Sequence, residues 1–255
     1  MAPLALSVLI TGSSRGIGLE LVRQLVEVTN PPEHIFATCR DPDGPRVKAL
    51  HELAKKHPSI CVIKLEVENQ SSVKAAVSVV GSHLKDKGLN LLINNAGVHS
   101  MANLETVEQQ ELLSVFNTNV VGPILLVKEF LSLLKKAAKE SPTQELSCSK
   151  AAIINMSSIA GSLERGLKDW PFSMYPYRTS KAALNMVTVC MAEELKGDGI
   201  LCTSIHPGWV KTDMGTEQAP LTVQCSVEGI LKVLAKLSSS SSGAFLDWEG
   251  KNIPW

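Results

Sequence analysis

The stretch Thr11-Gly12-Ser13-Ser14-Arg15-Gly16-Ile17-Gly18 follows directly on the apolar run Val8-Leu9-Ile10. Its glycines are spaced Gly-x3-Gly-x-Gly at the point where a strand is expected to turn into a helix over residues 17–28. Glycines at such a turn let the backbone approach a pyrophosphate, and the free N–H groups of the helix start favour an anion. Taken alone, a glycine-rich turn is also compatible with an ordinary tight loop. At a first strand–helix junction it predicts a dinucleotide site that uses Gly12, Ser14, Arg15, Gly16, Ile17 and Gly18.

The rest of the sequence alternates short β-branched runs with longer helical patterns. Strands are expected at 8–10, 34–39, 60–65, 91–93, 153–156, 200–205 and 243–246. Helices are expected at 17–28, 47–56, 71–84, 107–139, 177–195 and 223–237, and Gly122-Pro123 is expected to interrupt the longest of them. The order is the βαβ signature of a parallel sheet covered on both faces. We predict one α/β domain over residues 1–255, a Rossmann fold whose doubly wound parallel sheet has about seven strands and helices on both faces.

The composition argues against several classes of partner. Lys plus Arg and Asp plus Glu balance at 25 each, and no basic stripe marks a nucleic-acid or anionic-membrane surface. The apolar residues 1–10 lack a charged leader and a cleavage site, so a buried strand is expected there rather than a signal peptide, and no apolar run is long enough to span a membrane. The six cysteines form no CxxC pair and the six histidines form no ligand pattern. We therefore expect reduced thiols, a cytoplasmic protein and no metal site.

The end of the second expected strand indicates which nicotinamide cofactor is used. An NAD site usually carries an acid about 20 residues beyond the glycines, where it binds the ribose 2′-hydroxyl. Here the stretch reads Ala37-Thr38-Cys39-Arg40, so a thiol stands where the acid is expected and an arginine follows it. Arg15 would approach a 2′-phosphate from the other side, unless both arginines are merely solvated. Two arginine–phosphate contacts predict NADPH, with a preference of at least about tenfold over NADH.

A tyrosine and a lysine share one face of a later helix. Tyr177 and Lys181 lie four residues apart, and Ser158 ends an expected strand. A nearby ammonium makes a phenol a better proton donor, which a carbonyl oxygen needs while hydride reaches its carbon. Each feature alone is common by chance. Together with the glycine turn they predict a reductase site.

In these motifs the chain resembles the short-chain dehydrogenase/reductase family along nearly its whole length. The resemblance rests on the glycine turn, Asn94-Asn95-Ala96-Gly97, Asn119-Val120-Val121-Gly122, Ser158, Tyr177-x3-Lys181 and Pro207-Gly208-Trp209-Val210-x-Thr212. It implies that Tyr177 is the acid/base, that Lys181 binds the nicotinamide ribose and lowers the tyrosine pKa, and that Ser158 holds the carbonyl. Asn119 would kink its helix and anchor a water in a proton relay.

The same resemblance implies further cofactor contacts. Residues beside the adenosine, the ribose and the nicotinamide would be Glu66, Val67, Asn94, Asn95, Ala96, Gly97, Pro207, Gly208, Val210 and Thr212. Glu66 departs from the aspartate that the family usually has after the third strand, which puts the length of its adenine contact in doubt.

Within the family the chain is most similar to sniffer-type carbonyl reductases. This similarity rests on Pro31-Pro32-Glu33-His34-Ile35-Phe36, on residues 151–158, on His206-Pro207-Gly208-Trp209-Val210-Lys211-Thr212-Asp213-Met214, and on Gly243-Ala244-Phe245-Leu246-Asp247-Trp248. It implies NADPH-dependent reduction of reactive aldehydes, ketones, diones and quinones.

The region 159–176, longer than the family's commonest spacing, is expected to form the substrate loop. Its apolar residues include Leu163, Trp170, Phe172, Met174 and Tyr175, and Trp209 and Met214 follow in a later loop. We expect Trp170, Phe172, Trp209 and Met214 to form an apolar wall suited to a small hydrophobic carbonyl substrate, although any one of them could instead belong to the core.

Three alternatives remain open from the sequence. An NAD-linked alcohol or hydroxysteroid dehydrogenase would share the catalytic residues but not Arg15 and Arg40. A catalytically silent NADPH-binding sensor or scaffold would share the fold. The apolar residues 120–134 would serve either the core or a homodimer formed through the long middle helices.

Overall fold

Seven parallel strands form the centre of the computed structural model, which describes residues 3–168 and 171–255. The strand order is β3-β2-β1-β4-β5-β6-β7, and every neighbouring pair is parallel. The strands are β1 (Ser7–Ile10), β2 (His34–Cys39), β3 (Ile60–Lys64), β4 (Leu91–Asn94), β5 (Ala152–Met156), β6 (Leu201–His206) and β7 (Phe245–Asp247). The predicted α/β fold with a parallel sheet of about seven strands is confirmed.

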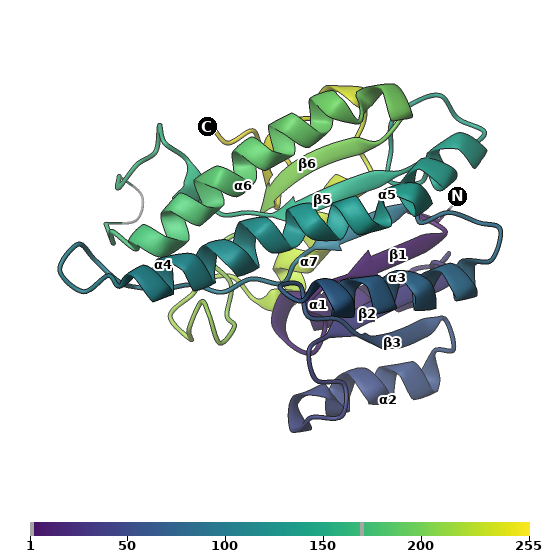
Figure 1. Ribbon diagram of the computed structural model, residues 1–255, viewed down its shortest axis with the longest axis horizontal. Coiled ribbons are helices and arrows are strands. Elements are labelled where there is room, and N and C mark those ends of the chain that lie inside the picture. The colour runs from purple at the N-terminus through teal and green to yellow at the C-terminus, as the bar shows by residue number, and fades with distance from the viewer. Residues whose placement is uncertain (1–2, 169–170) are drawn as a thin grey trace.

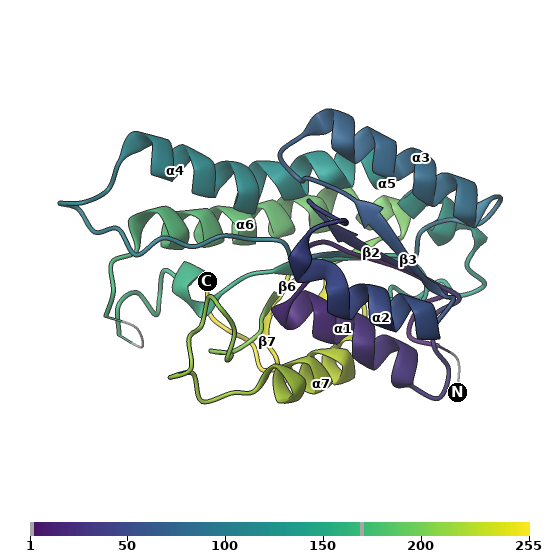
Figure 2. The same ribbon diagram turned by 90° about the horizontal axis from the view of Figure 1, so that it is seen from below.

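Helices cover both faces of this sheet (Figures 1 and 2). On one face lie α1 (Gly16–Glu27), α2 (Lys48–Lys56) and α7 (Val223–Leu234), and on the other α3 (Gln70–Leu84), α5 (Gly122–Glu140) and α6 (Tyr175–Glu194). Side chains alternate between the faces of a strand, so Val8 and Ile10 enter the first core and Leu9 enters the second. None of the helices in the described ranges is long and apolar enough to cross a membrane.

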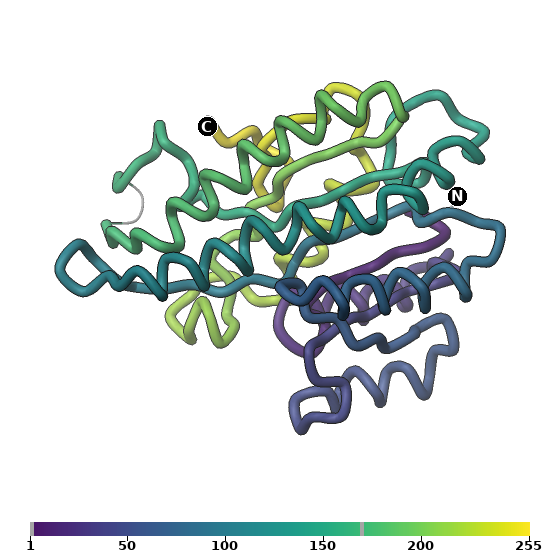
Figure 3. The backbone as a smooth tube through the Cα atoms, in the orientation of Figure 1, coloured from purple at the N-terminus to yellow at the C-terminus, as the bar shows by residue number. Residues whose placement is uncertain are grey.

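The long middle helix stays continuous but changes its hydrogen-bond pattern over one segment (Figure 3). Helix α4 (Gln109–Phe116) continues through a π-helical segment, Asn117–Val121, into α5. The sequence predicted that Gly122-Pro123 would interrupt the helix. This prediction is wrong, because the chain stays helical there. Pro123 has no N–H to donate to the carbonyl of Asn119 four residues earlier, and the wider π turn takes up this loss. The irregularity lies at Asn119 itself.

A buried chain of polar side chains ties helix α6 to the sheet. Asn94 Nδ2 donates to Asn155 Oδ1 at 2.8 Å, and Asn155 Nδ2 donates to Thr188 Oγ1 at 2.8 Å. Thr188 Oγ1 also lies 2.8 Å from Ser204 Oγ. Buried polar groups must be paired, so this chain permits few positions of α6 against β4, β5 and β6. The positions of the residues at the start of α6 therefore depend on this chain of hydrogen bonds.

Candidate active site

The glycine turn lies where the strand order reverses between β1 and β4. Gly12 and Gly16 take positive φ angles of +69° and +54°, which glycine adopts without strain. A Cβ on Gly18 would lie 2.2 Å from the carbonyl oxygen of Gly12, so the turn has no room for a side chain there. No side chain caps the start of α1, whereas Asn69 caps α3 and Thr222 caps α7. The first N–H groups of α1 are thus available to an anion, which fits a dinucleotide pyrophosphate.

A set of hydrogen bonds holds the residues after β4 against this turn. Asn95 Nδ2 donates to the carbonyl of Thr11 at 2.8 Å, and Thr11 Oγ1 accepts the N–H groups of Asn95 at 3.0 Å and of Ala96 at 2.9 Å. Asn94 is instead buried in the polar chain described above. Asn94 and Gly18 therefore lie behind the cleft surface rather than on it.

A cleft of about 500 Å³ collects most of the predicted cofactor residues. They are Gly12, Ser14, Arg15, Gly16, Ile17, Arg40, Glu66, Val67, Asn95, Ala96, Gly97, Tyr177, Lys181, Pro207 and Thr212. Gly208 and Val210 border the neighbouring cavity instead. The structure brings the set together from the ends of five strands and from helix α6, and the individual contacts with a cofactor stay predictions.

The two arginines predicted for the 2′-phosphate are both exposed and border the cleft. Cys39, which directly precedes Arg40, is 5% exposed, and its burial and the charge of Asp41 raise its pKa, so the thiol is neutral at neutral pH. A neutral thiol does not repel a phosphate. Arg15 forms an ion pair with Asp213 from the loop after β6, which the sequence did not predict. A phosphate would compete with that carboxylate for Arg15.

Helix α6 and strand β5 bring the predicted catalytic side chains together at one end of the cleft. Tyr177 is hydrogen-bonded to the Ser158 hydroxyl, and Lys181 Nζ lies 5.6 Å from the centre of the tyrosine ring. Lys181 is 5% exposed and donates to the carbonyl of Met156 at 2.8 Å. Tyr177 and Lys181 lie on α6, and Ser158 follows β5. A carbonyl oxygen beside Tyr177 would therefore meet the hydroxyls of both Tyr177 and Ser158.

Burial has the largest effect on the pKa values of Tyr177 and Lys181. Burial raises the pKa of Tyr177, and its hydrogen bond with Ser158 opposes that rise. Burial lowers the pKa of Lys181 from 10.5 to about 8. From the sequence, Lys181 was expected to favour the phenolate of Tyr177. In the structure, the hydrogen bond with Ser158 also favours that phenolate. Tyr177 is thus held as a neutral phenol, the form that donates a proton.

Asn119 completes the predicted catalytic set from the π-helical segment. Its Nδ2 donates to the carbonyl of Val98 at 2.8 Å and to Ser180 Oγ at 2.9 Å, and its Oδ1 accepts the N–H of Val98 at 2.9 Å. The side chain thus joins the segment after β4 to helix α6. Because residue 123 is proline, the Asn119 carbonyl has no α-helical N–H to accept. π-Bulges often lie at functional sites, and the predicted water on Asn119 stays a prediction.

A second cavity of about 170 Å³ adjoins the cleft at Tyr177. Ser158, Met174, Trp209 and Met214 border it, and most of its remaining lining is apolar. Of the predicted substrate residues, Trp209 and Met214 thus lie where expected. Phe172 is 49% exposed and does not border the cavity, and Trp170 lies outside the described residues. Phe172 is therefore not part of this cavity wall, and its contact with a substrate stays a prediction.

Two histidines border this cavity that the sequence did not assign to it. The ring of His99 meets Tyr177 edge to face with 6.3 Å between ring centres, and His206 ends β6. His99 follows Asn94-Asn95-Ala96-Gly97 closely, a position that could have suggested a place near the tyrosine. His206 stood inside a quoted motif, yet nothing in the sequence distinguished a core residue from a cavity residue.

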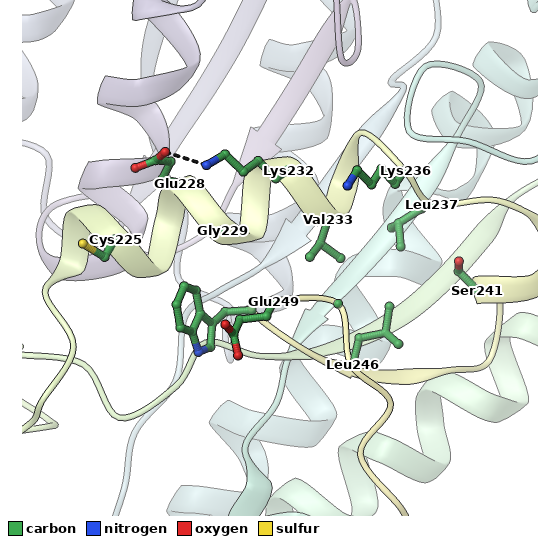
Figure 4. Close-up of a pocket in the computed structure, with 12 residues that line it drawn as sticks. Cys225, Glu228, Gly229, Lys232, Val233, Lys236, Leu237, Ser241, Leu246 and Glu249 are labelled. Atoms are coloured by element: carbon green, nitrogen blue, oxygen red, sulfur yellow. Dashed lines mark hydrogen bonds and ion pairs between the residues drawn. The ribbon is translucent and has the colours of Figure 1, made fainter.

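A separate open groove of about 690 Å³ runs between α7 and residues 246–250 (Figure 4). Glu228 and Lys232 form an ion pair of 2.6 Å on its rim. Among the described residues, none that the sequence predicts for chemistry borders this groove. The residues predicted for chemistry instead border the cleft and the cavity that share Tyr177.

Known proteins share both this fold and the sequence that builds it. The family model described as short chain dehydrogenase matches residues 7–221. The chain belongs to the short-chain dehydrogenase family. An NADPH-bound carbonyl reductase from chicken fatty liver is 50% identical, with a TM-score of 0.94 and coverage of 98% of this chain and 99% of that one.

Two further proteins extend the comparison. The carbonyl reductase Sniffer of Drosophila melanogaster is 43% identical, with a TM-score of 0.94 and coverage of 98% and 100% of the two chains. An uncharacterized oxidoreductase of Schizosaccharomyces pombe is 32% identical, and 96% of each chain is covered. The resemblance to sniffer-type carbonyl reductases that the sequence indicated is confirmed.

The buried Lys181 predicts a pH dependence of stability in the cofactor-free protein. The folded pKa of about 8 lies below the unfolded value of 10.5, so the unfolded state binds more protons between these limits. The free energy of unfolding of wild type should therefore rise relative to Lys181→Met by about 2 kcal/mol from pH 7.5 to 9.5. Above pH 10 the raised pKa of Tyr177 acts in the opposite direction.

Urea unfolding at the two pH values measures this difference. Lys74→Met, which removes an exposed lysine on α3, is the control and should run parallel to wild type. A wild-type curve parallel to that of Lys181→Met would contradict the burial of the ammonium.

Proposed function

We propose that the protein is an NADPH-dependent carbonyl reductase that reduces small, uncharged aldehydes, ketones or quinones. The observation that carries the proposal is the hydrogen-bonded pair of Ser158 and Tyr177 hydroxyls, placed where the cofactor cleft meets an apolar cavity. Residues 1–255 act as one catalytic unit, in which 159–176 form the substrate-loop region. An apolar cavity of this size favours small hydrophobic carbonyls over charged sugars.

The residues of the chain divide the work around the carbonyl oxygen. When bound, NADPH supplies the hydride. Ser158 donates a hydrogen bond that orients the carbonyl, and Tyr177 gives its phenolic proton to the oxygen as negative charge develops there. Lys181, buried beside the ring, stabilises the resulting phenolate, and a water on the Asn119 carbonyl returns a proton toward it.

The cleft residues hold the cofactor in this proposal. The uncapped start of α1 binds the pyrophosphate, and Arg15 and Arg40 bind the 2′-phosphate. Arg15 must leave Asp213 to do so, which costs little because both groups are exposed.

Substitution of Tyr177 tests the chemical step. Tyr177→Phe removes the proton donor and should lower kcat for 9,10-phenanthrenequinone reduction roughly 10²–10⁴-fold, while NADPH binding persists. Tyr175→Phe, two residues away on the exposed side, is the matched control and should behave as wild type. Absorbance at the nicotinamide band measures turnover. Equal loss in both variants, or none in either, would reject Tyr177 as the acid, and wild type that binds NADPH but reduces no carbonyl would favour the silent sensor.

Substitution of Arg40 tests the cofactor. Arg40→Ala removes one charge-assisted contact with the 2′-phosphate, so the ratio of kcat/KM for NADPH over NADH should fall about tenfold. Arg46→Ala, also exposed but outside the cleft, should leave the ratio unchanged. A wild type that prefers NADH would remove the roles of both Arg15 and Arg40 and favour the NAD-linked dehydrogenase.

We also propose a homodimer through the long middle helices, in the cytoplasm. Within residues 120–134, the side chains of Leu126, Val127, Phe130 and Leu134 are buried in the second core. Leu113 and Phe116 of α4 and Met186 of α6 are instead 49%, 41% and 62% exposed. The six free cysteines suit a reducing compartment. Sedimentation should show a dimer for wild type and a monomer for Phe116→Glu. A monomeric wild type at micromolar concentration would contradict the dimer.

A further inference from the structure

His206 lies one strand away from the residues that hold the reacting carbonyl. It is the last residue of β6, and the preceding Ile205 accepts the N–H of Ser157 at 2.8 Å. Adjacent strands lie about 4.8 Å apart. Ser204 points to α6, where it meets Thr188, and Ile205 enters the opposite core. By alternation the His206 side chain lies on the α6 face, the side from which Tyr177 comes.

The imidazole of His206 has no hydrogen-bond partner within the described chain. Its Nδ1 is fully buried and unpaired, and Nε2 has no partner either but stays accessible. The residue is partly exposed, and its exposed part borders the substrate cavity. Most buried polar atoms are paired, so an unpaired ring in a cavity wall is consistent with a group that a ligand completes.

The charge and tautomer of the ring follow from this burial. Burial lowers the pKa of His206 to about 4, so the ring is neutral at neutral pH despite Asp247 on the neighbouring strand. Asp247 Oδ1 already accepts the N–H groups of Glu249 and Lys251, both at 2.9 Å. An orphaned N–H is rarer in proteins than an orphaned acceptor. The favoured tautomer thus leaves the lone pair on buried Nδ1 and places the proton on accessible Nε2.

We propose that His206 determines substrate specificity by donating a hydrogen bond from Nε2 to a second oxygen of the substrate, next to the carbonyl that is reduced. The inference rests on the proposed carbonyl reductase activity. It assigns the cavity to uncharged carbonyl compounds with two neighbouring oxygens, such as 1,2-diones. Ser158 and Tyr177 hold the first oxygen, His206 holds the second, and the second oxygen is unchanged by the reaction.

Two matched substrates isolate this contact. 1-Phenylpropane-1,2-dione and 1-phenylpropan-2-one both offer the same carbonyl at the second carbon and differ only by the oxygen at the first. Steady-state kcat/KM with NADPH for each, in wild type and variants, gives the dione-to-ketone ratio. Any difference in intrinsic reactivity is common to all variants and cancels when their ratios are compared.

Two substitutions separate the ring nitrogens. His206→Gln places an amide N–H near the position of Nε2, and His206→Asn reaches only the position of Nδ1. The ratio should fall about tenfold in His206→Asn and stay within about twofold of wild type in His206→Gln. NADPH binding, followed by fluorescence, shows that each variant folds; if His206→Asn does not, His206→Leu replaces it.

The outcomes are distinct. A ratio that is unchanged in His206→Asn, or that falls equally in His206→Gln, overturns the role of His206 and leaves the reductase standing. Wild type that binds NADPH and reduces neither compound, nor 9,10-phenanthrenequinone, overturns the proposed function and this inference with it.

Discussion

Strands β1 and β4 lie side by side in the sheet, yet the chain leaves their carboxyl ends toward opposite faces, and this divergence opens the crevice on which the site depends. The glycine turn occupies one side of the crevice and Asn95 the other. Hydrogen bonds that Asn95 and Ala96 donate to Thr11 keep both sides in one arrangement. A side chain at Gly18 would press on the Gly12 carbonyl and open the turn. Residues far apart in the sequence meet here because parallel strands place all their carboxyl ends at one edge.

Helix α6 delivers the chemistry to this edge, and polar contacts in the core decide where it lies. The buried chain through Asn155 and Thr188 joins α6 to the sheet, and Asn119 joins it to the segment after β4. An apolar core tolerates small sliding of a helix, whereas a paired polar chain does not. Lys181 makes a further buried polar contact between α6 and the sheet, because its ammonium donates a hydrogen bond to the carbonyl of Met156. The site thus keeps a lysine whose pKa is lowered and a tyrosine whose pKa is raised by one common cause, the exclusion of water.

Periodicity and motif spacing predicted the strands well, because a doubly covered sheet requires continuous apolar runs that are plain in the sequence. They were less reliable where a single residue changed the geometry. The expected break at Gly122-Pro123 became a π turn at Asn117–Val121, since losing one donor costs less than ending a packed helix. Loop side chains were the weakest point. Phe172 was assigned to the substrate wall but is exposed, while Met174 two residues later is buried and borders the cavity.

The sequence by itself determined the order of the elements, the dinucleotide turn and the identity of the polar residues around Tyr177, because these depend on local backbone freedom and on fixed spacing along a helix. Only the tertiary structure decided which of those residues face the ligand. It placed Asn94 and Gly18 behind the cleft surface, paired Arg15 with Asp213, and left the His206 ring unpaired at a cavity wall. Burial and hydrogen-bond pairing depend on neighbours from distant parts of the chain, so no local pattern of residues encodes them.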